Sequence, residues 1–299
     1  MDGPGRVSAG AALPFFWRRM RGSVRPRPGA APLVPFDASA LARHPGLTWI
    51  GHSTFFFRMD GISFLTDPVF SERASPFSFA GPKRLVPPGV PLDALPRPDL
   101  ALLSHDHYDH TDLPSVRALA ERGVPFVLPT GVGALVREVG GTVAAELGWW
   151  QSAEIRGVRV TCVPARHFSG RGLTDRNRRL WAGFVVAGKN HRVYHAGDTA
   201  RFDGFAEIGR RLGPLDLVAL PIGAYEPAAM MAPVHLDPEE AVEAALVLGA
   251  RQAVGMHFGT FDLSDEALDE PPRRFLAEAA RRGLDGRAFV MAVGETRGF

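Results

Sequence analysis

Short apolar runs recur along the chain, and longer amphipathic stretches lie between some of them. Turn residues bound most of the short runs, which are rich in β-branched and aromatic side chains, as is typical of strands. On this pattern we predict strands at 47–50, 55–57, 62–65, 100–103, 126–128, 158–163, 182–186, 192–194, 217–220, 253–256 and 288–291.

Apolar positions spaced three and four residues apart predict helices in the longer stretches. The clearest candidates are 113–122, 202–212, 238–248 and 273–282. The helix at 238 has a strong start signal, because Asp237 suits the N-cap, Pro238 suits the first turn, and Glu239 and Glu240 follow. Strand-rich regions with interleaved helices predict an α/β (α+β) fold of packed sheets covered by helices.

The pattern predicts a single folded domain preceded by an N-terminal arm. Residues 41–299 show no internal repeat and no long linker, so we expect one domain there. Residues 1–40 read as a flexible basic N-terminal arm, with Arg21, Arg25 and Arg27 among prolines. An alternative is peripheral contact with an anionic membrane surface, through these arginines and Phe15, Phe16 and Trp17.

Composition and charge limit the possible site types, the cellular location and the partners. The formal net charge is +2, and the one cysteine, Cys162, excludes an internal disulfide and a cysteine-based zinc site. We expect a cytoplasmic location, at the inner membrane face if the arm binds lipid. The basic pI raises nucleic-acid binding as a hypothesis, but we find no RNA-binding module and expect no nucleic-acid partner.

The densest chemistry lies directly after the predicted strand at 100–103. Three histidines and two aspartates occur within six positions, at His105, Asp106, His107, Asp109 and His110. Imidazole and carboxylate are ligands that zinc and similar metals prefer. One metal needs only three or four ligands, so this cluster, with further candidates elsewhere, indicates two metals.

The same local arrangement recurs after three other predicted strands. His167 follows the strand at 158–163, Asp198 follows 192–194, and His257 directly follows 253–256. The carboxyl ends of strands are where sheets of this type gather their sites. These three residues and four from the cluster make seven candidate ligands: His105, His107, Asp109, His110, His167, Asp198 and His257. Asp198 is the natural choice for a bridging carboxylate.

The order His-x-His-x-Asp-His, then His, Asp and His, resembles the metallo-β-lactamase superfamily over about residues 45–295. Within it, several segments resemble the N-acyl-phosphatidylethanolamine-hydrolysing phospholipases D. They are Gly51-His52-Ser53-Thr54, Leu65 to Ser71, Gly81-Pro82-Lys83-Arg84, Ser104 to Asp112, Leu180-Trp181, Pro221 to Pro227, His235 to Ala241, His257 to Phe261 and Glu270-Pro271-Pro272. The resemblance implies a four-layer αββα sandwich.

The resemblance also implies roles for the candidate residues. It assigns one metal to His105, His107 and His167, and the other to Asp109, His110 and His257, with Asp198 bridging. It implies two divalent cations, with zinc favoured over manganese or iron. Asp67 matches an aspartate that orients the ligand loop, and His235 matches a histidine near the substrate.

The activity implied is cleavage of a phosphodiester bond in N-acyl-phosphatidylethanolamine or a related phospholipid. Two metals about 3.5–4 Å apart can activate a shared water. We expect Asp109 and His235 to take part in catalysis, His235 by binding or protonating the leaving group, and Tyr225 and Glu226 to contact the substrate. The alternative is a hydrolase of a sugar-phosphate lactone, a β-lactam or another cyclic ester or amide.

Two further sets of residues are candidates for substrate contacts. An apolar groove could be formed by Phe77, Phe79, Trp149, Trp150, Met230 and Met231. Four arginines near His167 could meet phosphate, or could lie in a solvated loop: Arg171, Arg176, Arg178 and Arg179.

Overall fold

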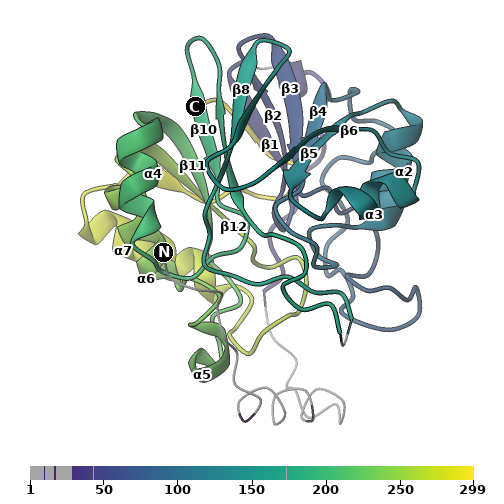
Figure 1. The fold of residues 1–299 in the computed structure, drawn as a ribbon. Coiled ribbons are helices and arrows are strands. Elements are labelled where there is room, and N and C mark those ends of the chain that lie inside the picture. Colours follow the sequence, from purple (N-terminus) through teal and green to yellow (C-terminus); the bar gives the residue numbers. More distant parts are fainter. Residues whose placement is uncertain (1–9, 11–16, 18–28, 43, 173) are drawn as a thin grey trace.

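The structure is a computed structural model that describes residues 10, 17, 29–42, 44–172 and 174–299 (Figure 1). Two seven-stranded sheets form its centre. The predicted arm at residues 1–40 lies largely outside the described residues, including Phe15, Phe16 and the three arginines. Its last part is described: the backbone of Ala31 bonds to Gly259, and that of Val34 bonds to Val293. Residues 31–34 are therefore attached to the folded domain.

The first sheet has the strand order β14-β1-β2-β3-β4-β5-β6. Strands β1 to β3 form an antiparallel meander, and β3 to β6 run parallel to one another. The bounds are β1 Gly46–Gly51, β2 Thr54–Met59, β3 Ile62–Thr66, β4 Leu100–Leu102, β5 Phe126–Pro129, β6 Val143–Leu147 and β14 Thr296–Arg297.

The second sheet follows the same plan, with the order β13-β12-β11-β10-β9-β8-β7. Strands β7 to β10 are antiparallel, and β10 to β13 are parallel. The bounds are β7 Ser152–Ile155, β8 Val158–Val163, β9 Gly183–Ala187, β10 Arg192–His195, β11 Leu215–Pro221, β12 Ala250–Met256 and β13 Ala288–Phe289.

Helices cover the outer faces of the two sheets (Figure 1). Helices α4, α6 and α7 lie beside the second sheet, and α2 and α3 lie beside the first. The short α5 lies at one end of the sandwich, below the sheets in this view. The bounds are α2 Leu113–Glu121, α3 Gly133–Glu138, α4 Gly204–Leu212, α5 Ala228–Met231, α6 Pro238–Val247 and α7 Glu270–Arg281, with a 3₁₀ turn at Ala40–Ala42.

Side-chain alternation explains why four layers form. On β2, Phe55 and Phe57 pack into the core between the sheets, whereas Phe56 packs into a second core beneath α2 and α3. Phe64 and Leu65 on β3 divide between the two cores in the same way. Successive side chains of a strand point to opposite faces, so strands that are apolar at every position must be covered on both faces. The predicted αββα sandwich is confirmed.

All the predicted strands and helices form, with end positions that differ by up to three residues. The pattern missed β6, β7 and β14 and the short helices α3 and α5. Strands β6 and β7 lie at sheet edges and carry exposed or half-buried polar residues such as Glu146 and Glu154, which weakens the apolar signal. No helix within the described ranges is long and apolar enough to span a membrane.

Candidate metal centre

The seven candidate ligands gather at one edge of the sandwich, in loops that leave the carboxyl ends of strands. The loop after β4 carries His105, His107, Asp109 and His110, and the other three residues follow β8, β10 and β12. Strands β8, β10 and β12 run in one direction, so their following loops meet at the same edge. The sequence prediction that these residues come together is therefore met by the structure, while their roles as ligands stay a prediction.

A first group consists of His105, His107, His167 and Asp198, whose candidate ligand atoms lie within 4.8 Å of one another. The Nδ1 atom of His107 lies 2.9 Å from His105 Nε2 and 3.2 Å from His167 Nε2. An oxygen of Asp198 lies 3.8 Å from His105 Nε2 and 3.7 Å from His167 Nε2. Ligand atoms around a tetrahedral zinc ion are about 3.3 Å apart, so this group fits one such ion.

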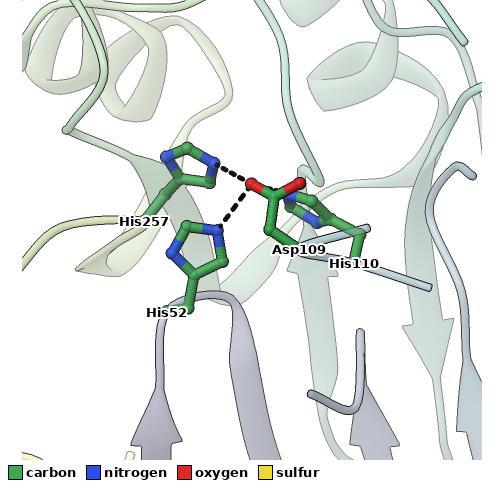
Figure 2. A group of neighbouring side chains, drawn as sticks. All are labelled: His52, Asp109, His110 and His257. Atoms are coloured by element: carbon green, nitrogen blue, oxygen red, sulfur yellow. Dashed lines mark hydrogen bonds and ion pairs between the residues drawn. The ribbon is translucent and has the colours of Figure 1, made fainter. Parts of the chain in front are cut away.

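A second group contains Asp109, His110 and His257, together with His52, which the sequence analysis did not select (Figure 2). The Oδ2 atom of Asp109 lies 3.1 Å from His52 Nε2, 3.7 Å from His110 Nε2 and 3.6 Å from His257 Nε2. The donor set is again imidazole and carboxylate, which zinc, manganese and iron accept.

Asp198 connects the two groups. The Oδ2 atom of Asp198 approaches His110 Nε2 at 3.1 Å and His257 Nε2 at 3.2 Å, in addition to its contacts with the first group. A third overlapping set joins Asp198 and His257 to His235. Asp198 was predicted to bridge two metals, and in the structure its carboxylate contacts histidines of both groups.

Hydrogen bonds behind the site orient several rings. Asp67 is fully buried, and its Oδ2 lies 2.8 Å from His110 Nδ1 and 3.0 Å from His195 Nε2, while its Oδ1 accepts the backbone N–H of Ser104 at 2.7 Å. His167 Nδ1 donates to the carbonyl oxygen of Val234 at 2.8 Å. These bonds leave the Nε2 atoms of His110 and His167 pointing into the site, which is how metal-binding histidines are held. Asp67 therefore lies where an orienting aspartate was predicted.

Arginines brace the loop after β4 from outside. Arg171 donates to the backbone oxygens of Asp106 and Thr111, at 2.6 and 2.8 Å, and stacks over Tyr108. Arg179 bonds to the buried carboxylate of Asp106 at 2.9 Å. These bonds tie Arg171 and Arg179 to the ligand loop, and phosphate binding by these residues stays a prediction.

The electrostatics of the site favour a bound cation. Burial alone would raise the pKa values of Asp109 and Asp198, but the neighbouring His110 and His257 hold both well below the usual range. Conversely, these carboxylates overcome the effect of burial and raise the pKa of His257 to about 9. A divalent cation would supply the same compensating charge and release those protons.

Other histidines of the site are held neutral. Burial, followed by the neighbouring histidines, lowers the pKa values of His105 and His167 well below normal. Burial also lowers the pKa of His235 to about 4. The neutral imidazole is the form that binds metals, so these residues are ready to act as ligands or as hydrogen-bonding groups near neutral pH.

A cavity of about 370 Å³ opens directly on both groups. Its polar wall includes His107, Asp109, His167, Asp198, His235 and His257. Apolar residues also line it: Ala74, Phe168, Met230, Met231, Val234 and Leu263. The arrangement suits a substrate with a reactive polar group and an apolar portion.

Only part of the predicted apolar groove lies here. Met230 and Met231 line the cavity from α5, but Trp149 and Trp150 pack against the core between the sheets. Phe77 and Phe79 are 55% and 79% exposed on the loop between β3 and β4.

The two predicted substrate contacts also lie outside the cavity lining. The hydroxyl of Tyr225 bonds to Glu270 at 2.8 Å, and Glu226 accepts the backbone N–H of Ala228 at 3.0 Å. Both side chains are therefore engaged in local contacts and do not line this cavity, and their contact with the substrate stays a prediction.

Strained backbone coincides with the site. His52, Asp67 and His257 have φ angles of 54°, 36° and 63°, values that residues other than glycine rarely adopt. Each of the three follows the carboxyl end of a strand, at β1, β3 and β12. Strain of this kind is retained where a functional arrangement requires it.

The fold and the paired His/Asp groups define a metal-dependent hydrolase. The chain belongs to the metallo-β-lactamase superfamily, because residues 63–258 match the family model described as "Beta-lactamase superfamily domain". Among curated relatives, an uncharacterised protein of Mycobacterium tuberculosis is 47% identical over 261 residues, which cover 85% of this chain and 68% of that protein.

The resemblance to lipid-hydrolysing members is also confirmed. The N-acyl-phosphatidylethanolamine-hydrolysing phospholipase D 1 of Caenorhabditis elegans is 41% identical over 257 residues, covering 81% of this chain and 72% of the relative. Among solved structures, an isothiocyanate hydrolase from Delia radicum gut bacteria matches 85% of this chain and 99% of its own length, with a TM-score of 0.68 and 20% identity. This structural likeness supports the fold alone.

Proposed function

We propose that the protein binds two divalent cations, with zinc favoured, and cleaves a phosphodiester bond in N-acyl-phosphatidylethanolamine or a related phospholipid. His105, His107 and His167 would hold one cation, and Asp109, His110 and His257 the other, with Asp198 between them. When bound, such a pair lowers the pKa of a shared water and neutralises charge on a phosphoryl oxygen.

The observation that carries the substrate class is the cavity beside both groups. Its lining combines imidazoles and carboxylates, which suit the reacting phosphate, with apolar side chains such as Met230 and Met231, which suit a hydrocarbon portion. A phospholipid has both parts, whereas a sugar-phosphate lactone lacks the apolar one. The 41% identity to a phospholipase D of this specificity supports the same choice.

The chain's own residues would position and neutralise the substrate. His235 borders the cavity, and its ring centroid lies 5.1 Å from that of His167 and 5.3 Å from that of His257. Because its pKa of about 4 leaves the ring neutral near neutral pH, it can donate an N–H hydrogen bond to the leaving oxygen. Asp109 lies on the same wall and can hold the proton of the attacking water.

Contact with a membrane surface through residues 1–40, at the inner face in the cytoplasm, belongs to the same proposal. Its support is the sequence alone, in which aromatic side chains are followed by arginines. No nucleic-acid partner is proposed.

The test combines metal analysis of the purified protein with a substrate panel. We expect two metals per chain, and turnover of N-acyl-phosphatidylethanolamine but not of a sugar-phosphate lactone or a β-lactam. Asp198→Ala is the matched variant, because it removes the carboxylate that both groups share and should lose metal and activity together. Fewer than two metals per chain would contradict the proposed centre, and turnover of the lactone or the β-lactam instead of the lipid would replace the proposed substrate.

A further inference from the structure

His52 lies in the second group, yet the metal-ligand pattern of the sequence does not include it. It directly follows β1 and is only 1% exposed. Its backbone N–H donates to the hydroxyl of Thr260 at 2.8 Å, and its carbonyl oxygen accepts from the indole of Trp49 at 2.9 Å and from the backbone N–H of His257 at 3.1 Å. The main chain of His52 is therefore fixed to the strand before it and to the loop that carries His257.

The imidazole of His52 makes one hydrogen bond, to Asp109. Its Nε2 lies 3.1 Å from Asp109 Oδ2, and Figure 2 draws this interaction as a dashed line. Because a carboxylate can only accept, this hydrogen bond requires the proton on Nε2. The other nitrogen, Nδ1, is buried and finds no hydrogen-bond partner among the described residues.

These contacts separate His52 from its neighbours in the group. His110 and His257 bring their Nε2 atoms to 3.1 and 3.2 Å from Asp198, whereas none of the ion pairs among the described residues joins His52 to Asp198. His52 thus reaches the second group through its contact with Asp109 and makes no such contact with the carboxylate that the two groups share.

We propose that His52 is a positioning residue for the second metal group. Its side chain holds the carboxylate of Asp109 through one hydrogen bond, and its carbonyl oxygen holds the main chain of His257 through another. One residue thereby sets the relative placement of two ligands that lie 148 positions apart in the chain. This inference rests on the proposed two-metal centre.

The experiment compares His52→Gln with His52→Phe. Glutamine places an amide N–H near the position of Nε2, so it keeps a donor for Asp109, while phenylalanine fills the space of the ring without a donor. Residue 52 has a φ angle of 54°, which is unfavourable for both substituted residues. A difference between the two variants therefore does not come from the backbone. His191→Phe is the control, because His191 makes a similar bond of 3.0 Å to Asp60 outside the candidate metal groups.

The readout is zinc affinity, measured by competition with a chelator, alongside the number of zinc ions retained. Loss of an orienting partner typically lowers metal affinity by about 10–100-fold. We expect a loss of that size for one of the two zinc ions in His52→Phe, most of it restored in His52→Gln, and no change in His191→Phe. Equal affinity in all three variants and the wild type would overturn the proposal.

Two further outcomes are decisive. If His52→Gln loses as much affinity as His52→Phe, then the imidazole is itself a ligand and the positioning role is wrong. If neither variant folds, nitrogen NMR of the zinc-loaded wild type decides, because the proposal requires a protonated Nε2 on His52 and a ligand would show a metal-bound nitrogen. A wild type that binds fewer than two zinc ions would instead contradict the proposed function.

Discussion

At the scale of single residues, the histidines of the site differ in what fixes them. His167 is locked because its Nδ1 donates to the carbonyl of Val234, and His110 is locked by Asp67. His235 has no such lock, since its Nδ1 is buried and has no hydrogen-bond partner within the described part of the chain. His257 shares this feature, so the assignment of His235 to the substrate rests on its place in the cavity lining and outside the two four-residue groups.

Replacing His235 with alanine should therefore impair catalysis and spare the metals. We expect His235→Ala to lower kcat on the phosphodiester substrate by about 100-fold, the lower end of the range for loss of an acid–base or hydrogen-bonding group. Two metals per chain should be retained in elemental analysis. Unchanged turnover would remove His235 from the mechanism, and loss of one metal would make it a ligand.

The sequence located the seven candidate ligands because chemistry and spacing coincide in them. His105 to His110 form a cluster too polar for a core, and the remaining three each follow a strand. His52 also follows a strand, β1, so the same rule could have selected it. It was missed because a lone histidine after a strand carries little weight, and its bond to Asp109 joins residues 57 positions apart.

At the scale of elements, helix α6 shows how a local sequence signal positions part of the site. The side chain of Asp237 accepts from the backbone N–H of Glu240 at 2.8 Å, and Glu240 accepts in return from the backbone of Asp237. This capping box fixes the start of α6 at Pro238, three residues after His235. The predicted N-cap is confirmed.

Removing the cap should destabilise the protein by a modest amount. We expect Asp237→Ala to lower the free energy of unfolding by about 1 kcal/mol, the usual cost of an N-cap deletion, as measured by urea denaturation. Asp203→Ala is the matched control, because the N-cap aspartate of α4 makes no capping side-chain bond in the described structure. An equal loss in both variants would show that the capping box contributes nothing specific.

Elements with strong periodicity or caps were predictable, and the missed ones lacked both signals. Strand β7 alternates between exposed and half-buried positions, and α5 contains only four residues, Ala228–Met231. The position of α5 beside the cavity depends on packing between distant loops, which a local pattern does not encode. The sequence therefore predicted the sheets and the longer helices better than the residues that line the cavity.

At the scale of the whole molecule, Asp60 joins the two sheets at the end remote from the candidate metal groups. It lies in the turn between β2 and β3 and accepts four hydrogen bonds of 2.9–3.0 Å from the backbone and side chains of Asn190 and His191. These partners lie in the turn between β9 and β10. Burial raises the pKa of Asp60, but the four donors outweigh it and lower the pKa to about 2.

This pKa gives a signed prediction for stability against pH. Because the folded-state pKa lies below the usual value of 3.8 for an aspartate, the ionised carboxylate stabilises the fold above about pH 4 and loses that effect as the pH falls towards 2. We expect Asp60→Ala to lower the free energy of unfolding by about 1–3 kcal/mol at pH 7. The difference from the wild type should shrink between pH 4 and pH 2, as followed by denaturant titration. A difference independent of pH would show that the charge of Asp60 does not matter.

Each candidate metal group takes residues from both sheets, and this affects the rates of folding and unfolding. In the first group, His105 and His107 follow β4 of one sheet, while His167 and Asp198 follow β8 and β10 of the other. Neither half of the chain can assemble the group alone, so it exists only once the two sheets have docked. Cations held there would stabilise the docked sheets and not the separate ones, so their removal should speed unfolding more than it slows folding.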